Sequence, residues 1–154
     1  CIRDRSYIIK DASLEDKEII LNLIGLAIDS GAYDKIFVNN TPLSVRNIYH
    51  TDFLPILCNQ DPFVIIYCRQ EAVGISAAST FVNAMYDLRH KCAIGTLTFI
   101  KSEHRGNGLL KKTHDLMTKK LKDMGIKKLM VERVRKKRED AKYQVASSYL
   151  ILDI

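Results

Sequence analysis

The sequence predicts an α/β fold with a mixed central sheet, and three observations lead to this prediction. Short apolar runs rich in β-branched residues have the length of strands, notably at residues 63–68 and 92–100. Two longer stretches, residues 19–28 and 109–124, carry apolar residues at helical spacing. The strand, helix and strand over residues 92–134 form a βαβ crossover, which requires a parallel strand pair inside the sheet.

Length and composition indicate one globular domain spanning residues 1–154. The chain is 47% hydrophobic and 27% charged, as is usual for a packed domain of this size. No apolar run approaches the roughly 20 residues that cross a bilayer, and residues 1–6 do not resemble a secretory signal. The four cysteines lack the close pairs of zinc sites and predict reduced thiols. We therefore expect a cytoplasmic protein with neither a metal site nor a membrane partner.

The first elements are a short strand at residues 7–9 and a helix over residues 19–28. Ser13 precedes the helix with an acidic residue three positions on, at Asp16, which is a variant of the capping box. Gly31 supplies the stop signal at the other end.

A second, shorter helix is predicted next. Thr41-Pro42 provides a cap and a proline at the first helical position, and Val45, Ile48 and Tyr49 form an apolar face. The segment 50–61 is predicted to be irregular because Pro55 interrupts it.

The remaining elements complete the order β-α-α-β-β-β-α-β. Residues 63–68 and 73–82 are separated by a polar break and predict an antiparallel hairpin. The strand at 92–100 contains Gly95, which favours a bulge or bend. A helix over 109–124 ends at Gly125, and a strand follows at 127–134. After it we expect a short C-terminal helix over residues 139–148 and a final strand at residues 149–154.

The segment from Ile100 to Leu110 carries the clearest chemical signal. Gly106 and Gly108 lie between a strand and a helix, where glycines let the backbone approach a ligand closely. The start of a helix offers unpaired N–H groups and a positive dipole end, a combination that binds phosphate. The spacing fits neither the dinucleotide fingerprint nor a Walker loop.

This segment resembles motif A of the GCN5-related N-acetyltransferases (GNAT), R/Q-x-x-G-x-G/A. Arg105-Gly106-Asn107-Gly108 matches its first four positions, with Ile100 and Glu103 at the expected offsets before it, whereas Leu110 stands where Gly or Ala is usual. Ala72-Val73-Gly74 resembles the start of the third strand of the family. The resemblance covers about residues 7–134 and implies a GNAT-like mixed central sheet.

The resemblance implies an N-acyltransferase that uses acetyl-CoA as co-substrate. An acetyl or short acyl group would pass to a primary amine by direct attack, without a covalent enzyme intermediate. Backbone groups of Phe99 and Ile100 would hold the pantetheine arm, and one of their N–H groups would polarise the thioester carbonyl. The pyrophosphate would be wrapped by the N–H groups of Arg105, Gly106, Asn107, Gly108, Leu109 and Leu110.

The resemblance also suggests catalytic residues, several of which remain alternatives. The acid of the family is commonly a tyrosine after the fifth strand, so Tyr149 is preferred here and Tyr143 comes next, although either could simply pack the C-terminal segment. Candidates for the base are Glu132, His90 and Glu103, or a water relay. Cys92 as an acyl-carrying nucleophile is disfavoured because the sequence places no histidine beside it. His104 and His114 are expected on the surface. Candidates for the acceptor pocket are Tyr33, Tyr49 and Asp52.

Charge is unevenly distributed, and this bears on the partners. Residues 101–142 contain 15 Lys and Arg against 6 Asp and Glu, a net +9 in a chain of net +6, so the remainder is acidic. An acidic half favours a cationic acceptor such as a protein lysine, a polyamine or an amino sugar. Two alternatives stay open: a CoA-binding module that has lost catalysis, and a GNAT-like protein that acts on nucleic acid through residues such as the basic run 133–138. A homodimer that completes the sheet is a further expectation.

Overall fold

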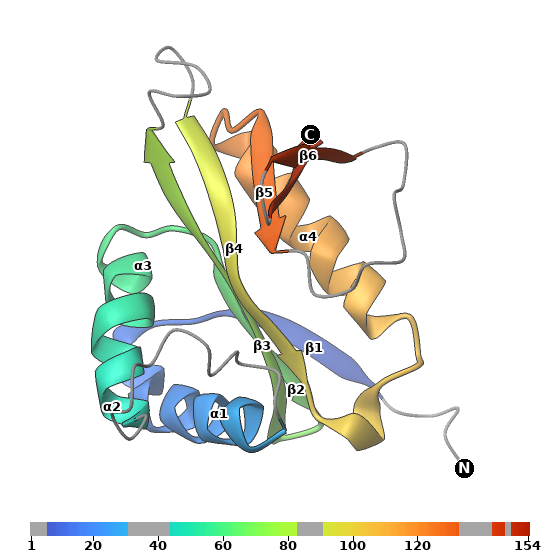
Figure 1. Ribbon diagram of the computed structural model, residues 1–154. Coiled ribbons are helices and arrows are strands. Elements are labelled where there is room, and N and C mark those ends of the chain that lie inside the picture. Colours follow the sequence, from blue (N-terminus) through green and yellow to red (C-terminus); the bar gives the residue numbers. More distant parts are fainter. Residues whose placement is uncertain (1–5, 31–43, 83–90, 133–142, 147–148) are drawn as a thin grey trace.

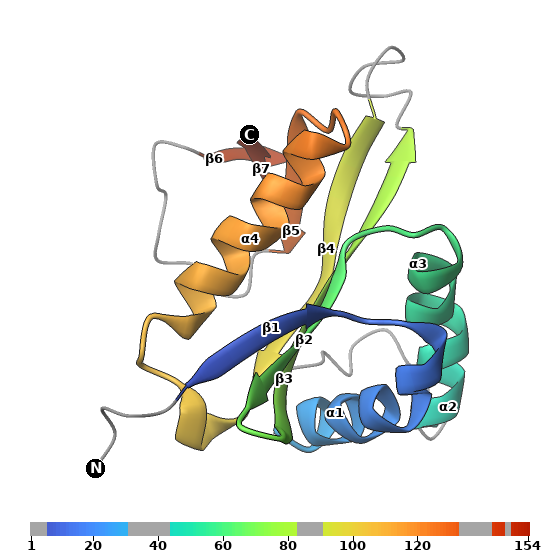
Figure 2. The same ribbon diagram turned by 180° about the vertical axis from the view of Figure 1, so that it is seen from behind.

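The structure, a computed structural model, describes residues 6–30, 44–82, 91–132, 143–146 and 149–154. Seven strands form one sheet in the order β1-β2-β3-β4-β5-β7-β6. All neighbouring pairs are antiparallel except β4 and β5, which are parallel. Helices α1, α2 and α3 cover one face of the sheet, and α4 covers the other (Figures 1 and 2). The predicted α/β class and the parallel pair are thus confirmed.

Strand β1 (Tyr7–Asp11) leads to a 3₁₀ turn (Leu14–Asp16) and helix α1 (Lys17–Asp29). The capping box predicted at Ser13 is present, because the Ser13 backbone N–H donates to Asp16 Oδ2 at 2.8 Å and the Ser13 side chain accepts from the Asp16 N–H. Four buried side chains of α1 contact the sheet: Ile20, Leu23, Ile24 and Ala27.

The next helical segment is longer than the sequence predicts. Helix α2 (Val45–Ile48) begins at Ser44, whose hydroxyl accepts from the Asn47 N–H at 3.4 Å, and it continues through a π-helical turn (Tyr49–Phe53) into α3 (Leu54–Cys58). The prediction of irregular structure after residue 50 is therefore wrong up to Cys58. The π-helical turn restarts the hydrogen-bond pattern, so Pro55 falls in the first turn of α3, where no intrahelical N–H is needed. The predicted start at residues 41–42 lies outside the described residues.

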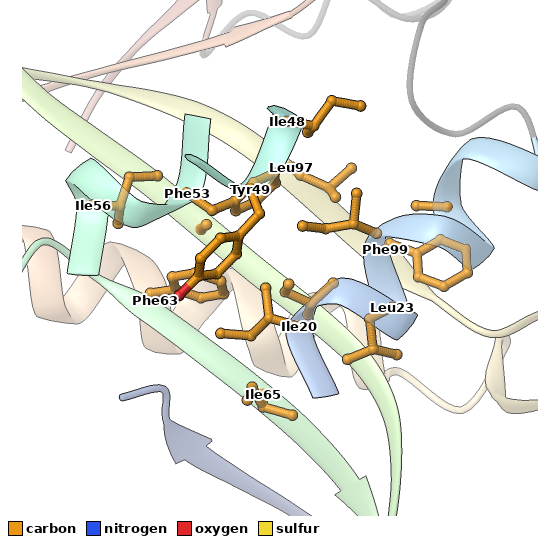
Figure 3. Packing of buried hydrophobic residues seen from close by; sticks show 14 residues of the cluster. Ile20, Leu23, Ile48, Tyr49, Phe53, Ile56, Phe63, Ile65, Leu97 and Phe99 are labelled. Carbon is orange, nitrogen blue, oxygen red and sulfur yellow. The ribbon is translucent and has the colours of Figure 1, made fainter. Parts of the chain in front are cut away.

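Apolar side chains of these helices and of the sheet form the main core. Phe53 packs against Phe63 with ring centroids 5.7 Å apart, and Ile20 and Leu23 lie over Ile65 and the neighbouring strands (Figure 3). Leu97 and Phe99 belong to the same core and extend it to the end of β4. Burial of this apolar surface is the main contribution to the stability of the fold.

Strands β2 (Phe63–Cys68), β3 (Glu71–Val82) and β4 (Lys91–Ile100) form the predicted meander. The register of β3 on β4 shifts between Ala77, opposite Leu97, and Ala78, opposite Gly95, which leaves Thr96 as an extra residue in β4. This is the bulge predicted at Gly95. It changes the alternation of the strand, so that Ala93 packs on the α4 side whereas Leu97 packs on the α1 side.

Helix α4 (Leu109–Asp123) and strand β5 (Lys128–Glu132) complete the crossover. The buried stripe of α4 comprises Leu109, Thr113, Met117 and Leu121. As predicted, the helix ends at a left-handed glycine, Gly125, whose φ is +79°. Among the described helices, none has the length and apolar character needed to cross a membrane.

The C-terminal segment forms two strands, β6 (Tyr143–Ala146) and β7 (Tyr149–Asp153), and β7 lies between β5 and β6. The predicted final strand is confirmed. The predicted helix over 139–148 is wrong at residues 143–146, which pair with β7 instead. Residues 133–142 lie outside the described residues.

Candidate active site at the open end of strand β4

Strands β4 and β5 are paired over a short distance only. The parallel ladder joins Cys92 to Lys128, Ala93 to Leu129 and Ile94 to Met130, and β5 ends beside the middle of β4 (Figure 1). From Gly95 to Ile100, β4 pairs only with β3 among the described residues. One edge of β4 is therefore available to a ligand.

The ladder determines which backbone groups face this open edge. The Lys101 N–H donates to Val73 O at 2.9 Å, so Lys101 directs its backbone groups toward β3. Because consecutive residues of a strand alternate in this respect, Phe99 also faces β3, and Thr98 and Ile100 face the gap. The backbone groups of Ile100 thus lie where the resemblance implies, whereas those of Phe99 do not, and Thr98 takes their place.

A cavity of about 320 Å³ lies at this edge, and we call it the strand-gap cavity. Its lining contains five of the eight residues predicted to bind the coenzyme, together with Thr98: Thr98, Phe99, Ile100, Arg105, Gly106 and Leu110. Sequence reasoning missed Thr98, although its position two residues before Ile100 on a strand was a usable signal.

Gly106 and Gly108 shape the turn between β4 and α4, residues 105–108, which we call the glycine turn. Their φ angles are +89° and +70°, and a Cβ added at either would meet no described atom within 4 Å. The glycines are therefore required by backbone conformation rather than by crowding. Gly108 is the N-cap of α4 and, as a glycine, supplies no side-chain cap.

The N-terminus of α4 is built to accept an anion. The first turn contains no acidic residue and carries the exposed Lys111 and Lys112, whereas the start of α1 has the acidic cap described above. The first backbone bond into α4 runs from the Lys112 N–H to Gly108 O at 3.0 Å. Among the described residues, the N–H groups of 106–111 have no backbone acceptor. Lys111 Nζ pairs with Asp115 Oδ2 at 2.9 Å on the next turn of the helix. The unpaired N–H groups, the helix dipole and Lys112 together favour a phosphate.

Arg105 connects the glycine turn to the open edge of β4. Its Nε donates to Ile100 O at 2.8 Å, and its guanidinium carbon lies 6.0 Å from the centroid of the Phe99 ring. A cation therefore lies at the mouth of the strand-gap cavity, on a carbonyl that faces the gap.

The other predicted residues of this segment have different roles. Leu109 is buried and anchors the helix start, while Leu110 is 60% exposed and lines the cavity mouth. Asn107 is exposed, and its Nδ2 donates to the Tyr7 hydroxyl at 3.4 Å. The expectation that His104 is a surface residue is wrong, because its side chain is only 6% exposed and lies 3.1 Å from the same Tyr7 hydroxyl.

Gly74, from the second region of resemblance, allows β3 and β4 to approach closely at this site. A Cβ on Gly74 would lie 2.8 Å from Phe99 O and 3.0 Å from Ile66 Cδ1. Any larger residue would push β4 away just where its other edge is open.

A second cavity of about 470 Å³, the α1 cavity, shares Phe99 and Arg105 with the first. Its full lining is Leu26, Asp29, Ser30, Phe99, Lys101, Ser102, Glu103 and Arg105. The pKa of Glu103 is lowered by a hydrogen bond from its own backbone N–H and by the Ser102 hydroxyl at 3.2 Å, so this group is a carboxylate at neutral pH. Asp29 adds a second exposed acid.

Two of the three predicted catalytic residues lie opposite each other on adjacent strands of the sheet. Glu132, the last residue of β5, is the register partner of Tyr149 on β7, whereas Tyr143 begins β6 opposite Leu152. Tyr33 and His90 lie outside the described residues.

Other predicted candidates lie away from both cavities. Tyr49 is buried in the core, and this burial raises the pKa of its phenol. Asp52, half-buried in the π-helical turn, lines neither cavity. Cys92 is buried at the paired end of β4, away from the open edge.

The comparisons with known proteins concern the fold. No protein-family model matches the chain, and no curated protein matches it in sequence. An N-acetyltransferase from Staphylococcus aureus Mu50 superposes with a TM-score of 0.69 at 14% identity, covering 96% of this chain and 98% of that one. A predicted acetyltransferase from Clostridium acetobutylicum, solved with acetyl-CoA, gives 0.71 at 15% identity and 96% of both chains.

A chain from the NatC complex bound to Gag peptide and CoA gives a TM-score of 0.66 at 16% identity, covering 97% of this chain and 99% of that one. These similarities extend over nearly the whole length of each protein. The chain therefore has the fold of the GCN5-related N-acetyltransferases, the family that its glycine turn resembles.

Proposed function

We propose that this chain is an acetyl-CoA-dependent N-acetyltransferase. The observation that carries the proposal is the N-terminus of α4, which lies at the open edge of β4. Its first turn has unpaired N–H groups, no acid and two lysines, of which Lys111 pairs with Asp115. Solved structures with the same fold contain acetyl-CoA or CoA. Binding by these residues needs only a diphosphate attached to a flexible amide-containing arm, which is the chemistry of coenzyme A.

In the proposed complex the N–H groups of the glycine turn and of Leu109 and Leu110 hold the pyrophosphate. The pantetheine arm runs along the open edge of β4, with its amides bonded to the backbone groups of Thr98 and Ile100. The Ile100 carbonyl accepts from Arg105 Nε, and its second lone pair can accept from an amide N–H of the arm.

The acceptor is proposed to be a primary amine, in the α1 cavity. Asp29 and Glu103 supply negative charge, and of the two cations in that lining, Lys101 and Arg105, Lys101 is paired with Glu71. These groups favour a cationic acceptor such as a lysine side chain, a polyamine or an amino sugar.

The proposed reaction is direct attack. The ammonium form of the acceptor first loses a proton to the base, and the neutral amine attacks the thioester carbonyl. The C–N bond forms and the C–S bond breaks, the nitrogen loses its second proton to give the amide, and the departing thiolate takes up a proton from the acid. Tyr149, or alternatively Tyr143, is proposed as the acid, and Glu132 or Glu103 as the base or as the end of a water relay. Conversion of Tyr149 to Phe is expected to lower kcat and to leave the Kd for CoA unchanged.

Calorimetric titration with CoA, followed by release of free thiol from acetyl-CoA with a panel of amines, tests the proposal. Saturable binding and amine-dependent thiol release are expected. Tight binding without turnover on any amine would instead indicate a CoA-binding module, and absence of binding would refute the assignment of the site.

A further inference from the structure

We infer that the hydroxyl of Tyr7 is a positioning group that holds the glycine turn in its anion-binding conformation. The inference deepens the proposed function and rests on it for its consequence in coenzyme binding. The Tyr7 oxygen lies 3.1 Å from His104 Nδ1, immediately before the turn, and accepts from Asn107 Nδ2 at 3.4 Å, within the turn. One hydroxyl from the first strand thus contacts residues that lie 97 and 100 positions later.

The glycine turn needs such support because packing does not fix it. Residues 105–108 are all exposed, and the space around Gly106 and Gly108 is open. A glycine adopts positive and negative φ about equally readily, so the backbone itself does not select this conformation. Contacts from outside the turn must limit it.

Tyr7 is well placed to supply these contacts. Its strand is paired with β2, where Tyr7 is opposite Cys68, and its ring packs against the buried cluster Ile66, Cys68, Val73, Ile100 and Leu109. The ring meets His104 edge to face, with centroids 5.8 Å apart and planes at 85°. The hydroxyl is therefore held by the sheet and by the residues that flank the turn.

The hydrogen-bonding capacities of the three groups are compatible. An amide Nδ2 can only donate, so the Tyr7 oxygen accepts from Asn107. The phenol keeps both a proton and a second lone pair, so it can form a hydrogen bond with His104 Nδ1 at the same time. His104 itself is buried, so it transmits the restraint to a fixed part of the chain.

The test compares Tyr7→Phe with Tyr67→Phe. Tyr67 is a half-buried tyrosine on β2 that contacts Lys10 and lines neither cavity, so it is a matched control for the loss of a hydroxyl. In Tyr7→Phe we expect the Kd for CoA to rise about tenfold, since two hydrogen bonds of ordinary strength are lost. The Kd should change less than twofold in Tyr67→Phe.

A substrate without the pyrophosphate distinguishes positioning from general damage. The KM for acetyl-pantetheine, and kcat at saturation, are expected to be the same in Tyr7→Phe and wild type. Equal losses with acetyl-CoA and acetyl-pantetheine, or a Kd for CoA that matches that of Tyr67→Phe, would overturn the inference.

The variant Asn107→Ala gives a second, independent test of the contact between Asn107 and the Tyr7 hydroxyl. Its effect on the Kd for CoA should disappear in the Tyr7→Phe background, because the hydroxyl that the amide contacts is already absent. A full additional effect in the double variant would mean that Asn107 binds the coenzyme directly and would contradict the bridging role.

A measurement without ligand keeps the inference separate from the proposed function. The backbone ¹⁵N order parameters of Gly106 and Gly108 are expected to be lower in Tyr7→Phe than in wild type or Tyr67→Phe. Lower order parameters in a protein that fails to bind CoA would support the positioning role and refute the proposed function, whereas unchanged order parameters would refute the positioning role itself.

Discussion

Replacing Gly108 by Ala separates backbone conformation from ligand binding, because the chain contains a matched control in Gly125. Their φ angles are +70° and +79°, and a Cβ at either would meet no described atom within 4 Å. Each substitution therefore adds the cost of a left-handed residue without a steric clash. That cost is about 1 to 2 kcal/mol of unfolding free energy, and it should be similar at the two positions.

Only Gly108→Ala is expected to affect the coenzyme. Gly108 is the N-cap of α4 at the strand-gap cavity, whereas Gly125 follows the opposite end of the same helix. Relief of the strain at position 108 rotates the peptide units that aim the first N–H groups at the anion. Loss of one hydrogen bond to a charged group is worth about 1.5 to 3 kcal/mol, or roughly ten- to a hundred-fold in Kd.

Urea unfolding and calorimetric titration with CoA, applied to wild type and both variants, check this prediction. Equal losses of unfolding free energy should accompany a weaker Kd in Gly108→Ala alone. If Gly108→Ala binds CoA as tightly as wild type, or if Gly125→Ala loses affinity to the same extent, then the N-terminus of α4 does not hold the pyrophosphate.

Three further predictions concern residues around the same site. Leu110→Ala should bind CoA at least as tightly as wild type, because Leu110 is exposed at the cavity mouth and alanine favours helix; a tenfold weaker Kd by calorimetry would mean that its side chain contacts the ligand. The ion pair with Lys101 lowers the pKa of Glu71 from its usual value of about 4.5, so the pair stabilises the fold above pH 4.5. The difference in urea unfolding free energy between wild type and Glu71→Gln should vanish as the pH falls through the lowered pKa. A difference that does not change with pH would contradict this. Thr98→Val should lower the unfolding free energy measured in urea by about 1 to 3 kcal/mol, because it removes the hydrogen-bond partner that lies 2.8 Å from the buried Ser76 hydroxyl. Adding Ser76→Ala should restore part of this loss, whereas strictly additive losses in the double variant would show that the two hydroxyls are not coupled.

Local signals in the sequence predicted several features correctly. The cap at Ser13, the bulge near Gly95 and the helix end at Gly125 depend on the residue itself and its close neighbours. The glycine turn belongs to the same class, because its glycines have the positive φ angles that its position between strand and helix requires.

Features that depend on contacts with distant residues, on the hydrogen bonding of the preceding turn or on strand register could not be predicted. Pro55 predicts a break in the helix, and it is the preceding π-helical turn that places this proline in the first turn of α3. His104 is buried because Tyr7, 97 residues earlier, lies against it. The backbone groups of Thr98, and not those of Phe99, face the open edge of β4. This depends on the register of β4 against β3, which the sequence alone does not determine.

The short ladder between β4 and β5 has a consequence for how the fold would respond to a ligand. Within the described part of the chain, three residue pairs join the strands before and after the crossover helix directly. A molecule that hydrogen-bonds along the remainder of β4 would act as an additional strand, uniting two portions of the sheet that otherwise share little backbone. Binding of such a molecule would raise the unfolding free energy by about 2.7 kcal/mol at a free concentration one hundred times its Kd. The rise in Tm on thermal denaturation would therefore measure saturation without any need for turnover.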